Sequence, residues 1–349
     1  MVSVRLGIRG IKYKKLILVI GTVLILVLIV GSYFKHQNNK LQKFIPKRYE
    51  EDGLYDFRQL PNIPTANGEY HLEAENDEEA QRLKTQVRVL CMIITNAANL
   101  PRKAMAVKDT WAKRCNKYVF ITDEEDKKFG TVGVHAEGRD HLTAKTIAGF
   151  KYVYENYRND YDWFFKTDDD TYVIVENLRY LLSHYHSTQS VYIGHHFDNV
   201  EIANKAGYMS GGGGYALSKA ALEQFVTVGV NESHPLALCR RDYGAEDAAI
   251  GRCMNKLGIK PAFSLDVHKR ETFHPFNVFT HLTGDFPSWY NKYKQNPVKG
   301  RDSLSDYSIT FHYVDPIMMY TMDHLIYHLH TYGIVKGKPP KKVFKIEQT

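Results

Sequence analysis

An aromatic segment that ends in three consecutive carboxylates constrains the fold of this chain more than any other stretch. Trp163, Phe164 and Phe165 are typical of a buried strand, and Asp168–Asp170 follow almost directly. Adjacent carboxylates repel one another, so a cation is expected beside them. Asp168 and Asp170 would project to the same side of an extended backbone, where their oxygens could bind a hard divalent ion. An acidic turn or a helix N-terminus is the simpler alternative.

Alternating strands and helices around this segment predict an α/β fold. Nearly continuous apolar runs indicate buried strands, and apolar residues at helical spacing indicate helices. The predicted strands cover 87–95, 118–122 and 191–194, and the predicted helices cover 141–158 and 175–185. This order favours a mostly parallel central sheet with flanking helices. Ligands of such sheets bind at the carboxyl ends of the strands, where the three acids would lie.

Three later segments offer further candidates for a functional site. The four glycines Gly211–Gly214 are too flexible for a plain strand and would allow a tight turn or a close approach to a ligand, although a simple hairpin is also possible. Glu246 and Asp247 begin a predicted helix, where the helix dipole favours acids but where one could also act as a general base. His312 lies in a short strand predicted at 310–315, and a lone histidine is more often structural than a ligand.

Positive charge gathers at the two ends of the chain. Residues 1–50 hold ten Lys or Arg against Glu50 alone, and residues 336–349 hold five Lys against Glu347, although the formal net charge of the whole chain is only +7. A nucleic-acid-binding protein should carry its basic surface on the folded domain. Nucleic acid is therefore not expected as a partner.

The N-terminal region predicts a membrane anchor. Residues 16–34 are apolar and uncharged, which is long enough to cross a bilayer as a helix and longer than the apolar part of a cleaved signal peptide. We expect a type II signal anchor with residues 1–15 as its cytoplasmic tail. A polar lumenal stem would cover 35–84, a folded domain 85–333, and a basic flexible tail 334–349.

The cysteines agree with an oxidising compartment. Cys91, Cys115, Cys239 and Cys253 include no Cys-x-x-Cys pair, so a zinc site is not expected. Four cysteines allow three pairings, and we favour the two local ones, Cys91–Cys115 and Cys239–Cys253. Disulfides and the N-glycosylation sequon at Asn231 both fit a lumenal domain.

A series of motifs in this chain resembles the β1,3-glycosyltransferases of family 31, and within it the branch that transfers galactose to O-linked GalNAc. The motifs occupy residues 108–115, 137–140, 163–173, 207–218, 246–253, 271–276 and 311–315. The resemblance spans about 87–333 and implies a GT-A-type nucleotide-sugar-binding fold. It further implies a divalent metal ion, usually Mn²⁺, and inverting transfer of galactose from UDP-galactose to the 3-hydroxyl of GalNAc-Ser/Thr on glycoproteins.

The same resemblance implies roles for individual residues and a cellular setting. The metal ligands would be Asp168, Asp170 and His312, and the catalytic base would be Asp247, with Glu246 as its rival. The side that binds the nucleotide-sugar donor would include Arg139, Asp140, Lys145 and Asp169. The residues near the sugars would be Tyr208, Gly212, Gly213 and Trp289. A Golgi membrane protein is implied, with a homodimer and a chaperone as open options. A different donor or acceptor, such as a glycolipid, and a non-catalytic lumenal chaperone without the metal-binding acids are the alternatives.

Overall fold

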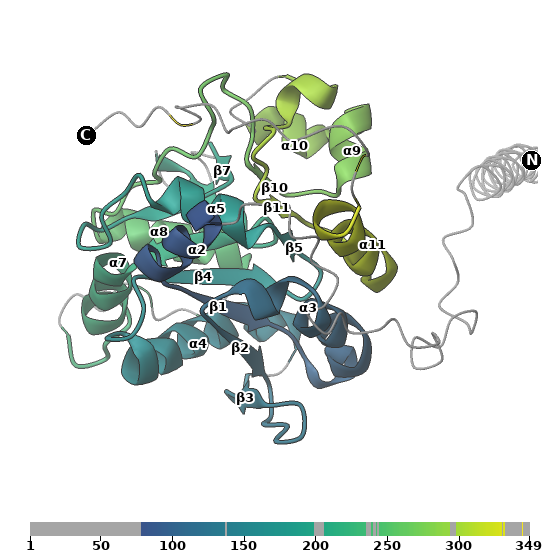
Figure 1. Ribbon diagram of the computed structural model, residues 1–349. Helices are drawn as coiled ribbons and strands as arrows, with labels where there is room; N and C mark the ends of the chain where they lie inside the picture. The colour runs from purple at the N-terminus through teal and green to yellow at the C-terminus, as the bar shows by residue number, and fades with distance from the viewer. Residues whose placement is uncertain are drawn as a thin grey trace, which may run out of the picture. The chain divides into compact units, whose positions relative to one another are not determined.

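The fold was analysed in a computed structural model of the chain (Figure 1). The structure describes residues 78–329, apart from 137, 199–205, 235–238, 240–241, 243 and 294–297, together with Thr331 and Phe344. The predicted cytoplasmic tail and anchor lie outside the described residues, as do most of the predicted stem and C-terminal tail. No helix in the described part of the chain has the length and apolar character needed to span a membrane.

A mixed sheet, six-stranded within the described residues, forms the centre of the fold (Figure 1). Its strands in spatial order are β3 (Thr131–Gly133), β2 (Lys117–Thr122), β1 (Val89–Ile94), β4 (Trp163–Asp168), β9 (Tyr215–Ser218) and β6 (Tyr192–Gly194). Strands β3, β2, β1 and β4 are parallel, as predicted, whereas β9 is antiparallel to both β4 and β6. The sheet is less parallel than expected because β9 starts at the carboxyl end of β4, directly after the glycine run, instead of following a crossover helix.

Helices cover both faces of this sheet (Figure 1). On one side lie α2 (Glu78–Gln86), α3 (Met105–Asp109), α5 (Val175–Leu182) and α11 (Pro316–Tyr327), and on the other α4 (Leu142–Tyr157), α7 (Lys219–Gln224) and α8 (Glu246–Lys256). Residues 89, 91 and 93 of β1 face the first core, whereas 90, 92 and 94 face the second. Because both faces are covered, every residue of β1 is buried, which explains its continuous apolar sequence.

The start of α2 corrects the predicted stem boundary. Residues 78–84 were assigned to the stem, but they form most of this helix. Glu78 and Glu79 lie in its first turn, where acids are favoured by the helix dipole. The helix was missed because Leu83 is its only buried residue, so no apolar period is visible in the sequence.

Smaller sheets in the described residues bring distant segments to the end of β4. One consists of β10 (Phe273–His274), β11 (Thr310–Phe311) and β5 (Tyr172–Val173), and the other of β7 (His196–Phe197) and β8 (Tyr208–Met209). Strand β5 follows the three acids and pairs antiparallel with β11 through Tyr172 and Phe311. The next residue, His312, is thereby carried to the acidic turn. Helices α9 (Val278–Thr283) and α10 (Ser288–Tyr293) lie between β10 and β11 in the sequence.

Both favoured disulfides are present in the structure. Cys91 of β1 pairs with Cys115, and Cys239 pairs with Cys253 of α8. Asn231 of the sequon is exposed, and its glycosylation stays a prediction.

One residue of the predicted C-terminal tail packs on the folded domain. Phe344 is buried, and its ring lies 5.4 Å from those of Tyr180 and His184.

Candidate active site

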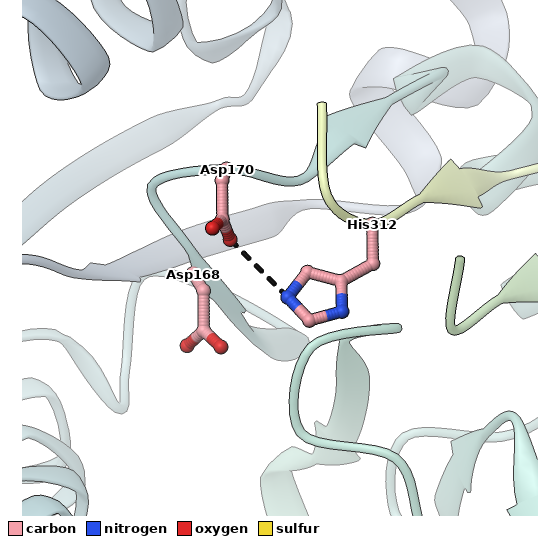
Figure 2. Close-up of side chains that lie close together, drawn as sticks. All are labelled: Asp168, Asp170 and His312. Carbon is pink, nitrogen blue, oxygen red and sulfur yellow. Dashed lines mark ion pairs between the residues drawn. The ribbon is translucent and has the colours of Figure 1, made fainter. Parts of the chain in front are cut away.

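Asp168, Asp170 and His312 come together at the carboxyl end of β4 (Figure 2). One ligand atom from each side chain lies within 4.8 Å of the others, and this is the one group of its kind among the described residues. Nε2 of His312 is 3.2 Å from Oδ1 of Asp170. These are the three side chains that the resemblance implied as metal ligands.

The chemistry of this group fits a divalent metal ion. Nδ1 of His312 lies 3.2 Å from the carbonyl oxygen of Pro275. A carbonyl can only accept a hydrogen bond, so Nδ1 carries a hydrogen and Nε2 is the atom that can bind a metal. Two carboxylates and one imidazole form an oxygen-rich set of the kind that suits Mn²⁺. All three side chains are partly exposed, which leaves the site open to an ion.

Two lysines that the sequence analysis did not single out face the acids. Nζ of Lys166, a buried residue of β4, is 2.8 Å from Oδ1 of Asp168, and Nζ of Lys103 is 3.3 Å from Oδ2 of Asp170. Burial acts to raise the pKa of Asp170, but its contacts with His312 and Lys103 outweigh this effect and lower the pKa to about 2. The protein thus supplies part of the positive charge expected beside the acids. A lysine inside an apolar strand was the signal available for Lys166, since such a residue is rarely buried without a partner.

The middle acid, Asp169, is turned into the protein. Its Oδ2 accepts hydrogen bonds from Oγ1 of Thr95, at 2.6 Å, and from Nδ2 of Asn99, at 2.8 Å. Burial raises its pKa to about 6, against the effect of these bonds. Asp169 therefore links the loop after β1 to the acidic turn. Its contact with the nucleotide-sugar donor stays a prediction.

We expect Asp169→Ala to lower the free energy of unfolding by about 2–4 kcal/mol, because the buried hydroxyl of Thr95 and the partly buried amide of Asn99 would lose their acceptor. Asp169→Asn should cost much less, since its amide oxygen can accept both bonds. Urea unfolding of the two variants beside the wild type measures the difference. Equal stability of the alanine variant and the wild type would contradict this role for Asp169.

Glu246 and Asp247 both lie in the first turn of α8, but in different surroundings. Glu246 is buried; its Oε2 is 3.3 Å from Nζ of Lys166, and its Oε1 accepts a hydrogen bond from the Tyr215 hydroxyl at 2.7 Å. Asp247 is partly exposed and accepts backbone N–H bonds from Gly211 at 3.1 Å and from Ala248 at 2.8 Å. Burial raises the pKa of both acids. Because Glu246 is held by interior partners, Asp247 is the better candidate for a base that reaches a substrate.

The glycine run forms a turn that packs against both parts of the site. A Cβ on Gly212 would collide with the ring of His312, and a Cβ on Gly211 would lie 2.6 Å from Oε2 of Glu246. Glycine is needed at both positions because the backbone passes directly beside these side chains. The carbonyl oxygen of Gly213 accepts a bond from Oγ1 of Thr310 at 2.6 Å. The glycine run therefore forms a tight turn, as one of the sequence-based alternatives predicted, and a close approach to a ligand stays a prediction.

Three of the four implied donor-side residues, Arg139, Asp140 and Lys145, lie around the start of α4. Lys145 is buried, forms an ion pair with Asp123 and donates to the carbonyl oxygen of Thr95 at 3.2 Å. Asp140 lines an open pocket of about 620 Å³. The backbone of Arg139 begins the adjoining turn, and its side chain lies outside the described part. Of these residues, Lys145 is joined to the acidic turn, through Thr95.

Aromatic residues adjoin the site on the side of His312. Tyr208 is buried, whereas the side chain of Trp289 is 47% exposed and packs 5.9 Å from Phe276. Tyr313, which the sequence analysis missed, is 57% exposed, stacks on His312 at 3.8 Å and lies 5.9 Å from Phe276. Its backbone has a φ of +55°, a left-handed conformation that no sequence signal indicated.

An α/β sheet that carries an acidic metal-binding group and a neighbouring candidate base at its carboxyl edge has the architecture of an enzyme that transfers groups from nucleotide sugars. Comparison with protein families agrees. The Fringe-like family matches residues 89–325, and the chain belongs to that family. The glycosyltransferase family implied by the motifs is therefore confirmed.

Individual relatives show which transferases the chain is similar to. The chain is 43% identical over 288 residues to the glycoprotein-N-acetylgalactosamine 3-beta-galactosyltransferase 1 of Xenopus laevis, which covers 80% of this chain and 77% of the relative. It is 26% identical over 197 residues to a beta-1,3-glucosyltransferase of Mus musculus, covering 55% and 38%. It is also 29% identical over 184 residues to the human chondroitin sulfate glucuronyltransferase, covering 51% and 22%.

Proposed function

We propose that this protein transfers galactose from UDP-galactose to the 3-hydroxyl of GalNAc-Ser/Thr on glycoproteins, with inversion, to form the core 1 O-glycan. The observation that carries the proposal is the group of Asp168, Asp170 and His312 next to the candidate base Asp247. The Xenopus relative supports galactose as the transferred sugar and GalNAc on a glycoprotein as the acceptor, because its name states both. The sequence identity extends over most of both chains.

Asp168, Asp170 and His312 would hold the metal ion, which we propose to be Mn²⁺. When bound, such an ion neutralises negative charge that develops on the departing diphosphate. The hydrogen bond between Nδ1 of His312 and Pro275 orients the imidazole so that Nε2 faces the acids. Lys166 fixes Asp168 from the interior side of the strand.

Asp247 would accept the proton of the acceptor hydroxyl as its oxygen attacks the anomeric carbon. Attack from the face opposite the departing UDP converts the α linkage of the donor to a β linkage. The backbone N–H groups of Gly211 and Ala248 orient the carboxylate. Glu246, through Lys166 and Tyr215, anchors the first turn of α8 that carries this base.

The remaining roles follow the same proposal. Arg139, Asp140 and Lys145 would lie toward the nucleotide, and the exposed rings of Trp289 and Tyr313 would offer apolar surfaces to the sugars. The predicted anchor in residues 16–34 would hold the catalytic domain in the Golgi lumen. A homodimer and a need for a chaperone belong to the same proposal.

Release of UDP by the purified full-length protein tests the function. The reaction contains Mn²⁺, UDP-galactose and a GalNAc-threonine peptide, with EDTA in one control and UDP-GlcNAc in another. We expect metal-dependent turnover only with UDP-galactose and the GalNAc peptide. Turnover with another donor or with a glycolipid acceptor would support the proposed reaction type but correct the proposed substrate. Absence of both transfer and UDP binding by folded protein would favour the non-catalytic chaperone.

A further inference from the structure

Lys103 stands at the open side of the acidic group, and the proposed mechanism does not use it. Its Nζ is 3.3 Å from Oδ2 of Asp170, and its side chain is 37% exposed. Lys166, the lysine on Asp168, is fully buried. The two lysines therefore differ in solvent exposure. The ammonium group of Lys103 can contact a ligand that arrives from solvent, whereas that of Lys166 cannot.

The position of Lys103 is built into the fold. It lies in the one-turn π-helix Leu100–Ala104, an element that occurs frequently at functional sites. Asn99, four residues earlier, donates to Asp169 at 2.8 Å, while Lys103 contacts Asp170. The same loop thus contacts the two consecutive acids Asp169 and Asp170. The hydrogen bond of Asn99 to Asp169 keeps Lys103 beside the metal-binding group.

The partner that Lys103 has in this structure is one that a metal ion would compete for. A bound cation needs the oxygens of Asp170 and repels the ammonium group, so it weakens the contact between Lys103 and Asp170. An ammonium has three N–H donors, of which the Asp170 contact takes one. Displaced from Asp170, it would be a half-exposed cation beside the place where the diphosphate carries its charge.

We propose that Lys103 exchanges partners, pairing with Asp170 in the free protein and with the diphosphate of the nucleotide sugar once metal and donor are bound. This inference rests on the proposed function and names a binding residue for it. It has a distinctive consequence. Lys103 opposes metal binding in the absence of nucleotide and favours nucleotide binding in the presence of metal, so that its removal should shift the two affinities in opposite directions.

Two binding measurements on the full-length protein test the exchange, with no need for turnover. Electron paramagnetic resonance of free Mn²⁺ gives the metal affinity without nucleotide, and calorimetry gives the affinities for UDP and UMP in saturating Mn²⁺. For Lys103→Met we expect Mn²⁺ to bind about threefold to tenfold tighter, and UDP to bind about tenfold or more weaker because a charge-assisted hydrogen bond is lost. UMP, which lacks the second phosphate, should lose less than UDP.

Matched variants separate a binding role from a structural one. Lys113→Met makes the same replacement at an exposed lysine and should leave all three affinities unchanged, while Lys103→Arg should keep UDP binding close to wild type. Lys103→Gln repeats the test if the methionine variant shows no melting transition. Unchanged affinities, or a joint loss of Mn²⁺ and UDP binding, would overturn the exchange. A wild-type protein that binds neither would overturn the proposed function itself.

Discussion

Replacing Asp168 and Asp170 together with asparagine is expected to abolish Mn²⁺ binding and to lower galactose transfer by about 10³-fold or more, since metal stabilisation of the leaving group contributes several kcal/mol. Asparagine keeps the shape of each side chain but removes the charge that holds a divalent ion. His312 would remain, and one imidazole is too weak a site by itself. Titration with Mn²⁺ and the UDP-release assay measure the two effects.

Asp160→Asn provides a control, because Asp160 is an exposed aspartate in the loop before β4. This variant should bind Mn²⁺ and turn over like the wild type. Retention of metal binding by the Asp168→Asn, Asp170→Asn protein would show that the group in Figure 2 is not the metal site. If the variant with alanine at both positions still supported the cellular role of the protein, the assignment as an enzyme would be wrong and a role as a non-catalytic chaperone would be favoured.

Asp247→Asn should reduce kcat by about 10²–10⁴-fold, the range that general-base catalysis contributes. Binding of Mn²⁺ and UDP should stay as in the wild type, since Asp247 lies outside the metal-binding group. Steady-state kinetics together with calorimetry separate the two quantities. A loss of UDP binding equal to the loss of kcat would contradict the assignment of Asp247 as a base.

The variant Glu246→Gln tests whether Glu246, and not Asp247, is the catalytic base. It removes the carboxylate that faces the buried ammonium of Lys166, and breaking one partner of a buried ion pair destabilises a protein strongly. We therefore expect a lower melting temperature for Glu246→Gln and a decrease in kcat smaller than that of Asp247→Asn. The opposite order of kcat values would identify Glu246 as the base.

The pH dependence of kcat/KM provides a further check on Asp247. Burial raises the pKa of its carboxyl above that of an ordinary aspartate. A base must be ionised to accept a proton, so the rate should fall as the pH drops through this raised pKa. The acidic limb of the wild-type profile should thus lie at higher pH than the titration of an ordinary aspartate, and it should be absent from the residual activity of Asp247→Asn.

Much of the fold could be predicted because its signals are local. Strands β1, β2 and β4 are buried on both sides, so their apolar runs are visible without knowledge of their partners. Helix α4 has apolar residues at helical spacing and was placed within a residue or two. The antiparallel course of β9 was not predicted, since it depends on how the glycine turn meets β4.

The candidate site divides in the same way. The sequence by itself determined the acidic pair at the carboxyl end of β4 and the acids at the start of α8, because each is a short pattern tied to one element. Motif resemblance was needed for His312, which lies 142 residues beyond Asp170. Only the tertiary structure decided that Lys166 and Tyr215 engage Glu246 while Asp247 stays partly exposed, and that Lys103 faces Asp170. Contacts of this kind join elements far apart in the chain, and their strength depends on burial and distance, which no local pattern records.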